Sequence, residues 1–235
     1  HVASYGKDLR NGTSLIDVIE EVSKTDGIER IRLSSMEPRH ITRDFLERMK
    51  ETQKACDHFH LSLQSGSDEI LKAMNRKYDT KIFKEKVDLI REVFPNAGLT
   101  TDIIVGFPTE TEENHEETKD FVKEIKFAKT HLFKYSKRDG TKAASMKPEV
   151  NGNIKKQRLK ELEAIEEVNR LNFLKNQIGK TLSVLFESKS DMEGYKSGYS
   201  TNYLRVNVKD DIRDNEIRDV LITEIKNDEL IGILS

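Results

Sequence analysis

The sequence predicts an α/β protein, in which a partial parallel βα barrel is followed by a small all-β barrel. Short apolar strands alternate with amphipathic helices over residues 1–152, as in a parallel βα array. Only about four or five such steps are present, fewer than the eight of a closed barrel, so the array is expected to be incomplete. From residue 178 onward, short strands separated by turns indicate a small β-barrel.

The clearest strand-to-helix step lies within residues 57–78. Apolar and polar residues alternate along its first half, which predicts a strand with two different faces. The apolar positions of this strand are Phe59, Leu61 and Leu63. Gly66 is expected to permit the backbone turn, and Ser67 or Asp68 to cap the next helix. Ligands bind at this edge of parallel sheets, although an ordinary surface loop explains the pattern equally well.

Other strands and helices follow in the same alternation. Strands are predicted over residues 28–35, 103–105 and 131–135. Helices are expected to begin where a side-chain oxygen can accept a backbone N–H. The candidate caps are Thr13 or Ser14, Thr42, Asp79 or Thr80, and Thr109 or Thr111.

A long helix is predicted to connect the two parts of the chain. Its apolar positions recur at every third residue, and its other positions are dense in Lys, Arg and Glu, which indicates a solvated face. The predicted domains are therefore a partial barrel over residues 1–152, a connecting helix over 153–177 and a small β-barrel over 178–235.

Composition argues against several classes of protein. The 235 residues contain no apolar run of the length that spans a membrane, so no membrane partner is expected. The single cysteine, Cys56, excludes an intramolecular disulfide, and no secretory signal is visible, so a cytoplasmic location is expected. A formal net charge of −2 argues against polyanion binding over the whole surface, although local patches could still bind one.

Two groups of side chains could carry chemistry in the predicted βα array. Cys56, His58 and His60 lie two residues apart, so a strand would present them on one face as zinc ligands. No fourth ligand is evident in the pattern, and packing inside the array is the more ordinary explanation. Asp102 lies beside an apolar strand, where it is either hydrogen-bonded structure or a cofactor contact.

A cluster of tyrosines and cations marks the predicted β-barrel. Tyr195, Tyr199 and Tyr203 fall within nine residues, beside Lys196 and Arg205. Aromatic faces stack on unpaired bases and cations meet phosphate, so this interleaving favours an RNA contact. The segment over residues 178–235 nevertheless holds 8 Lys or Arg against 11 Asp or Glu, so any such contact is a local patch.

Several motifs in a fixed order carry a resemblance that covers nearly the whole chain. They are LSSMEP, CDHFHLSLQSGSDEILKAMNRKY, TDIIVGFPTET, YSKRDGTKA and GYSTNYLRVNV. Together they resemble the radical-SAM methylthiotransferases that modify tRNA. LSSMEP and GYSTNYLRV look most like the branch that adds a methylthio group to carbon 2 of N6-threonylcarbamoyladenosine beside the anticodon.

The resemblance implies a radical-SAM partial barrel, followed by a TRAM-type β-barrel that binds the tRNA anticodon stem-loop. It also implies S-adenosylmethionine and two [4Fe–4S] clusters as cofactors of the complete enzyme, one cluster being held by the cysteines of a CxxxCxxC motif. This chain has a single cysteine. The cluster ligands are therefore expected to precede His1, and the chain is expected to be a C-terminal portion that is inactive alone.

The motif match also implies site residues. Those expected to line the S-adenosylmethionine pocket are Ser62, Gln64, Ser65, Asp102, Val105, Gly106 and Arg138. Those expected to contact RNA are Tyr195, Lys196, Tyr199, Tyr203 and Arg205. No residue is assigned a catalytic role. Two other functions stay open: a non-catalytic tRNA-binding fragment, and a metal-dependent barrel enzyme that uses Cys56, His58 and His60.

Overall fold

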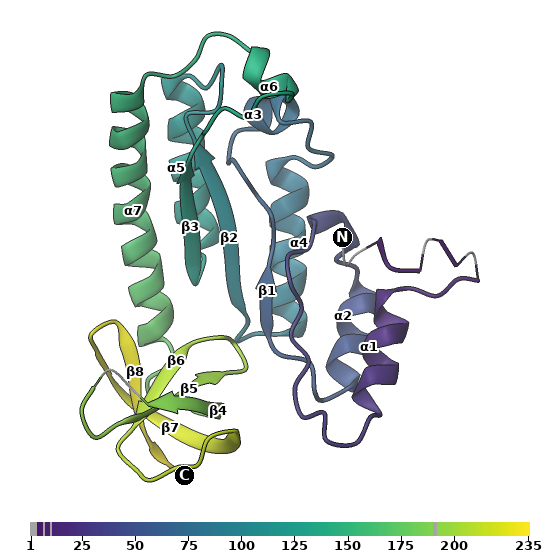
Figure 1. Cartoon of the computed structure of the whole chain (residues 1–235), viewed down its shortest axis with the longest axis vertical. Helices are drawn as coiled ribbons and strands as arrows, with labels where there is room; N and C mark the ends of the chain where they lie inside the picture. Colours follow the sequence, from purple (N-terminus) through teal and green to yellow (C-terminus); the bar gives the residue numbers. More distant parts are fainter. Residues whose placement is uncertain (1–3, 7, 10, 190–191) are drawn as a thin grey trace.

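The computed structural model describes residues 4–6, 8–9, 11–189 and 192–235. An α/β part forms the upper portion of the molecule in Figure 1, and a small β-barrel forms the lower portion. The long helix α7 (Gly152–Lys175) runs along one side of the α/β part and leads into the barrel. Among the described residues, no helix combines the length and the apolar character that crossing a membrane requires.

The α/β part is built on a sheet of three parallel strands. The strands pair in chain order and are β1 (His58–His60), β2 (Gly98–Val105) and β3 (Lys129–Lys134). The helices between them are α3 (Asp68–Ala73), α4 (Thr80–Val93) and α5 (Glu112–Ile125). Phe59 and Ile103 from the sheet share one buried core with Phe83 of α4 and Val122 of α5. One face of the sheet is therefore covered by helices.

Shorter elements precede and follow this sheet. They are α1 (Leu15–Ser23), the 3₁₀ turn η2 (Pro38–His40), α2 (Arg43–Glu51) and α6 (Lys142–Ser145). Four of the predicted helix caps are confirmed, whereas Ser67 occupies the N-cap position of α3 without a capping hydrogen bond from its side chain. Ser14 caps α1 together with Asp17, and the other cap residues, whose side chains each accept a backbone N–H, are Thr42, Asp79 and Thr111.

The expected number of parallel strands was too high, because residues 28–35 do not form a strand. This segment meets the chain before and after β1 at two isolated bridges, Ile31 with Ala55 and Met36 with Leu61. Between the two bridges, Ile31 to Met36 spans five residue steps along one segment, whereas Ala55 to Leu61 spans six along the other. The two segments therefore go out of register between the bridges. The slip leaves the residues between the two bridges out of the ladder, so this segment does not form a strand.

The turn after β1 also differs from the prediction. The residue with positive φ is Gln64 (77°), and Gly66 does not take a positive φ. A Cβ atom at Gly66 would lie 2.7 Å from the Cα of Thr118 and 2.9 Å from the Cβ of Phe121, both in α5. Gly66 is therefore required because α5 packs directly against the turn, whereas Gln64 changes the direction of the chain.

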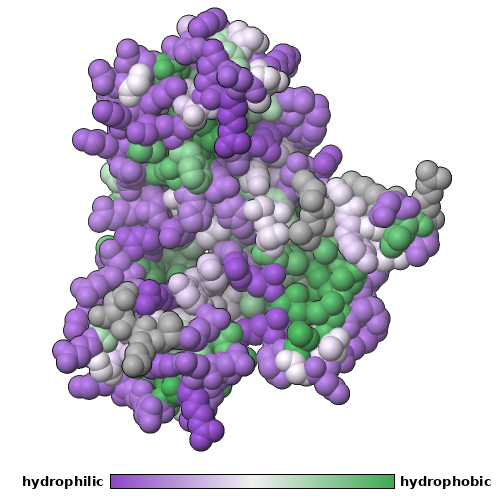
Figure 2. Space-filling model, in the orientation of Figure 1, coloured by the Kyte–Doolittle hydropathy of each residue, from purple (hydrophilic) through white to green (hydrophobic). Residues whose placement is uncertain are grey.

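Helix α7 has the solvated face that its charge pattern predicted. The left edge of the molecule, where α7 runs in Figure 1, is mostly hydrophilic in Figure 2. The apolar stripe is only partly buried: Leu162 and Leu174 lie in the interior, whereas Val168 is 59% exposed. A repeat of three residues drifts around a helix of 3.6 residues per turn, so part of the stripe rotates into solvent.

The small barrel follows α7. Its five strands are β4 (Thr181–Lys189), β5 (Lys196–Ser200), β6 (Arg205–Val208), β7 (Glu216–Lys226) and β8 (Glu229–Leu234). They close in the order β4-β5-β6-β8-β7 around a core that includes Val184, Phe186 and Val206. Closure leaves no unpaired edge among the five strands that the structure describes.

The barrel packs tightly against the amino end of the sheet. A Cβ atom at Gly98, the first residue of β2, would lie 2.2 Å from the carbonyl oxygen of Asn202. The Arg30 guanidinium donates to the Tyr199 carbonyl at 2.9 Å and to Ser183 Oγ at 3.0 Å. The joint between the two parts of the molecule is therefore direct and hydrogen-bonded.

Candidate functional site

The sheet face opposite the α4 and α5 helices lines two cavities. Because side chains alternate along a strand, every second residue of β1, β2 and β3 points to this face. The residues nearer the barrel are His58, His60, Thr100, Asp102, Lys129 and His131, and those nearer the carboxyl edge of the sheet are Gln64, Ile104 and Phe133. The predicted division of the first strand into an apolar and a polar face is confirmed.

The first cavity, which we call the edge cavity, lies at the carboxyl ends of the strands and has a volume of about 840 Å³. Ile104 and Phe107 supply apolar walls, and Gln64 and Arg138 supply polar groups. The Tyr135 ring packs edge-on against Phe107 at 5.4 Å, and its buried hydroxyl has no hydrogen-bond partner among the described residues. An unpaired buried hydroxyl in a cavity wall suits a polar ligand.

Only two of the residues predicted to bind S-adenosylmethionine, Gln64 and Arg138, line the edge cavity. Asp102 lines the second cavity instead. Ser65 and Val105 are both 1% exposed, Ser65 with its hydroxyl 3.3 Å from Thr118 Oγ1 and Val105 within the apolar core.

The last two residues of that set act through their backbones in this structure. Gly106 donates its N–H to Glu110 Oε1 at 2.9 Å, and the Ser62 carbonyl accepts from the Tyr78 hydroxyl. Burial raises the pKa of Tyr78 to about 12, so this hydroxyl stays protonated and can donate at neutral pH. Binding of the cofactor by these seven residues stays a prediction.

The second cavity, which we call the joint cavity, lies between the sheet and the barrel and has a volume of about 990 Å³. A stack of rings forms part of its wall. Tyr199 and Tyr203 are parallel within 20° at 4.9 Å, and His58 of β1 lies 4.9 Å from Tyr203. The Arg32 guanidinium lies over the Tyr203 ring, 4.0 Å from its centroid. We call these four residues the ring stack.

His58 is the member of the ring stack that belongs to the sheet. It is 4% exposed, and burial, followed by the charge of Arg32, lowers its pKa to about 4. The imidazole is therefore neutral at pH 7, and it can stack beside the Arg32 cation without repulsion. Sequence reasoning missed Arg32, although its position between Ile31 and Leu33 already indicated a side chain on the opposite face from those two apolar residues.

The five residues predicted to contact RNA do not all lie together. Tyr199, Tyr203 and Arg205 line the joint cavity, whereas Tyr195 and Lys196 do not. Lys196 forms an ion pair with Asp214. Arg205 donates to Ser197 Oγ at 2.8 Å and lies 3.3 Å from a Glu229 carboxylate oxygen. The RNA role of all five residues stays a prediction.

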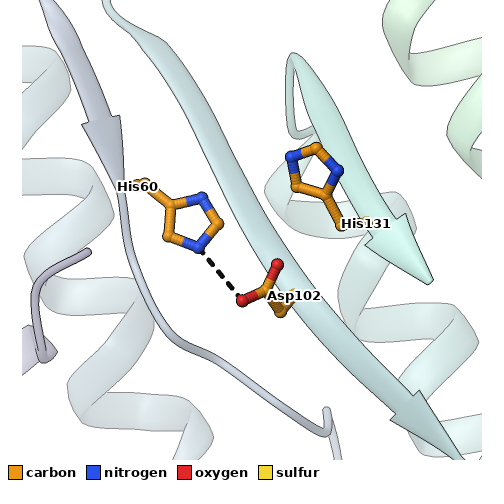
Figure 3. Close-up of side chains that lie close together, drawn as sticks. All are labelled: His60, Asp102 and His131. Atoms are coloured by element: carbon orange, nitrogen blue, oxygen red, sulfur yellow. Dashed lines mark hydrogen bonds and ion pairs between the residues drawn. The ribbon is translucent and has the colours of Figure 1, made fainter. Parts of the chain in front are cut away.

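No metal ligand was predicted from the sequence, and the alternative set of Cys56, His58 and His60 does not form one group of neighbouring ligand atoms among the described residues. Among the described residues, the group whose ligand atoms all lie within 4.8 Å of one another consists of His60, Asp102 and His131. Figure 3 shows these side chains on three neighbouring strands, with a contact of 3.3 Å between His60 Nε2 and Asp102 Oδ2. Cys56 is buried and lies before β1 begins, so its thiol is outside this group.

Comparison with known proteins identifies the class of the α/β part. Residues 6–122 match the family model described as the radical SAM superfamily, so this segment is similar to radical SAM domains. Coproporphyrinogen III oxidase from Escherichia coli, a radical SAM enzyme, superimposes with a TM-score of 0.54 at 15% identity. That superposition covers 81% of this chain and 50% of the oxidase, and at this identity it supports the fold alone.

Sequence relatives narrow the class to a family. The chain is 44% identical over 192 residues to the tRNA-2-methylthio-N6-dimethylallyladenosine synthase of Acetivibrio thermocellus, covering 81% of this chain and 40% of that protein. It is 39% identical over 237 residues to the enzyme of the same name from Carboxydothermus hydrogenoformans, covering 100% of this chain and 54% of that protein. These similarities support a place in the radical-SAM tRNA methylthiotransferase family, and they give no specific support to the threonylcarbamoyl branch.

The chain spans about half the length of these relatives, and its residues fit the family's two kinds of cofactor unequally. The edge cavity, with apolar walls, an unpaired hydroxyl, an amide and a guanidinium, fits S-adenosylmethionine. An iron–sulfur cluster needs three or four thiolates, whereas the sequence contains one cysteine. Burial raises the pKa of that thiol, which disfavours the thiolate form.

We therefore expect this chain to remain without a cluster after anaerobic treatment with iron and sulfide. The protein should lack the broad visible absorption of a [4Fe–4S] centre, and it should not form 5′-deoxyadenosine from S-adenosylmethionine under reduction. Measured iron and sulfide after desalting check the first point, and chromatography of the nucleosides checks the second. Four irons per chain together with 5′-deoxyadenosine would overturn both expectations.

Proposed function

We propose that this chain is the cofactor- and tRNA-binding part of a methylthiotransferase that modifies carbon 2 of an N6-substituted adenosine beside the anticodon. The radical SAM match and the methylthiotransferase relatives support the reaction class. The observation that carries the proposal is the ring stack, because it adds aromatic and cationic surface to the same sheet face that lines the edge cavity.

In this proposal the edge cavity holds S-adenosylmethionine, which supplies the methyl group and the radical chemistry of the family. Ile104 and Phe107 would enclose its adenine, and the Gln64 amide would hydrogen-bond its ribose hydroxyls. Arg138 would pair with its carboxylate. The chain's own residues thus bind and orient the cofactor, and no group of this chain is assigned to radical formation.

The joint cavity would receive part of the anticodon loop. Tyr203 is the most exposed ring of the stack, at 42%, so the exposed part of this side chain can contact an unpaired base. Stacking of one base on an aromatic side chain contributes roughly 1–3 kcal/mol. Arg32, whose guanidinium lies over the same ring at 4.0 Å from its centroid, adds a positive charge toward the phosphates.

We expect Tyr203→Ala to weaken binding of an anticodon stem-loop by about five- to a hundredfold, as the loss of one stacked base predicts. Tyr5→Ala is the matched control, because Tyr5 is an exposed tyrosine that does not line the joint cavity. Fluorescence anisotropy with a labelled stem-loop measures the affinities, and circular dichroism verifies that both variants are folded. Equal affinities for the parent and Tyr203→Ala would exclude the ring stack as the RNA contact.

Two candidates have support as the N6 substituent. The relatives are named for dimethylallyladenosine, whereas the motifs LSSMEP and GYSTNYLRV resemble the threonylcarbamoyl branch. The threonylcarbamoyl group carries a carboxylate, which the Arg32 cation can attract, and the dimethylallyl group is apolar. Stem-loops carrying each substituent, titrated against the parent and Arg32→Leu, distinguish the two candidates. Preference for the threonylcarbamoyl loop that disappears in Arg32→Leu supports that branch.

A tRNA-binding chain without catalysis is the second candidate function, and the single cysteine is the observation that favours it. Both functions predict RNA binding at the ring stack. Only the first predicts that the chain binds S-adenosylmethionine in the edge cavity, which calorimetry with the parent and Arg138→Leu measures directly. Failure of that cofactor to bind the folded parent would favour the second function.

A further inference from the structure

We propose that His60, Asp102 and His131 form a binding site for a single divalent transition-metal ion of the zinc or iron(II) class. This site is distinct from the cofactors that the fold family implies, and it does not depend on the proposed RNA contact. The three side chains come from β1, β2 and β3 and lie on the face of the sheet that lines the joint cavity (Figure 3). We call them the His–Asp–His group.

Strand register brings the three ligands together. Asp102 and His131 are direct partners across β2 and β3, and His60 lies on the other side of β2, paired with Thr100. All three side chains therefore point to the same face from neighbouring positions. Because rigid, hydrogen-bonded strands carry the ligands, their relative positions are fixed before any ion binds.

The distances between ligand atoms suit coordination after small side-chain rotations. A tetrahedral ion with bonds of about 2.1 Å places its ligand atoms roughly 3.4 Å apart. His60 Nε2 and Asp102 Oδ2 are 3.3 Å apart, and the ligand atom of His131 completes a set within 4.8 Å. Two imidazoles and one carboxylate are a donor set used by both zinc and non-haem iron(II) sites.

Thr100 hydrogen-bonds to the ring nitrogen of His60 that faces away from the proposed ion, and this contact orients the His60 ring. The Thr100 hydroxyl lies 2.9 Å from His60 Nδ1, and the whole Thr100 residue is 7% exposed. When Nδ1–H donates to this hydroxyl, the Nε2 lone pair points toward Asp102, and two electron-rich atoms then face each other at 3.3 Å. A cation between them removes the repulsion, and the nearby His131 supplies its third ligand.

A plain hydrogen bond between His60 and Asp102 is the competing explanation. Such a pair occurs elsewhere in the chain, where the buried His115 Nε2 lies 3.0 Å from Glu161 Oε2. The cation Lys119 lies next to that pair, with its Nζ also 3.0 Å from the Glu161 carboxylate. The His–Asp–His group instead has a second imidazole in the third position, which can act as a ligand but does not supply a fixed charge.

The group is also open on one side. His60 is 15% exposed and Asp102 is 31% exposed at their side chains, and both line the joint cavity. An ion held by three protein atoms there keeps at least one position for water or for an oxygen or nitrogen of a ligand. The arrangement is that of an open site and differs from a closed structural zinc site.

Titration of the full chain with Co²⁺ under anaerobic conditions tests the proposal. We expect one cobalt ion per chain, with visible ligand-field absorption, displacement by Zn²⁺ and no competition from Mg²⁺. Asp102→Asn and His131→Phe should each abolish this absorption. Thr100→Val should weaken the affinity by about ten- to a hundredfold, as loss of an outer-sphere partner does. Cys56→Ser is the control and should bind as the parent does, because Cys56 is outside the group.

A second measurement keeps the test decisive if a variant does not fold. In the parent protein, Co²⁺ should shift or broaden the imidazole NMR signals of two of the six histidines, His60 and His131, more than the others. Absence of saturable cobalt binding by the folded parent would overturn the proposal. Undiminished binding by folded Asp102→Asn and His131→Phe would overturn it as well, and would assign the ion to another site.

Discussion

Replacing Arg158 by methionine is expected to lower the free energy of unfolding by about 3–5 kcal/mol, as removal of one partner from a buried ion pair does. Arg158 Nη1 donates to Glu110 Oε1 at 2.6 Å, and the two side chains are only 5% and 4% exposed. The substitution leaves the Glu110 carboxylate buried, with the Gly106 N–H as its remaining donor in this network. An uncompensated buried charge is the source of the large loss.

Urea denaturation followed by circular dichroism measures the effect, and two further variants sharpen it. Lys160→Met adds the same side chain at an exposed position of α7 and should change stability by no more than about 0.5 kcal/mol. The double variant Glu110→Gln with Arg158→Met should recover part of the loss, because no buried charge is left unpaired. If Arg158→Met unfolds at the same urea concentration as the parent, water reaches the pair and the burial argument fails.

This pair also connects stability with the edge cavity. Glu110 accepts the N–H of Gly106, which directly follows β2, and Phe107 of the same turn forms part of the cavity wall. Loss of Arg158 should therefore loosen this turn as well as the contact with α7. Weaker S-adenosylmethionine binding by Arg158→Met than by Lys160→Met, at a temperature where both are folded, is the expected consequence.

Local chemistry made the helix starts predictable from the sequence. Ser14, Thr42, Asp79 and Thr111 each lie beside the N–H groups that they cap, so a few residues of sequence contain the whole interaction. The failed strand over residues 28–35 depends instead on register with a segment more than twenty residues away. A slip of one residue between distant segments leaves no mark on the alternation of either segment alone.

The candidate site was predictable only in part, for the same reason. Alternation indicated which face His60 and Asp102 occupy, but His131 joins them only through the pairing of β2 with β3. Arg32 meets its aromatic partner only because the barrel packs against the sheet. Arg158, within a helix whose charges indicate solvent, is buried because Glu110 from another segment lies opposite. Each miss concerns a contact between segments distant in sequence.

Gly66→Val is expected to lower the free energy of unfolding by about 3 kcal/mol, the upper end for overpacking a well-packed interior. Even the first added carbon would lie 2.7 Å from the Cα of Thr118, whose backbone cannot move without shifting α5. The same shift would strain the hydrogen bond of 3.1 Å from the Gly66 N–H to Thr118 Oγ1. Steric contact with α5, and not a positive φ, is the reason for the loss.

A graded series separates this contact from a general effect of removing glycine. Gly66→Ala adds only the clashing Cβ and should already cost about 1–3 kcal/mol. Gly152→Ala is the matched control, because a Cβ there meets open space at the start of α7, and it should be neutral or stabilising by up to about 1 kcal/mol. Urea denaturation of the three variants, followed by circular dichroism, measures these changes in the free energy of unfolding. A Gly66→Ala protein as stable as Gly152→Ala would mean that α5 does not approach the turn as closely as the 2.7 Å contact indicates.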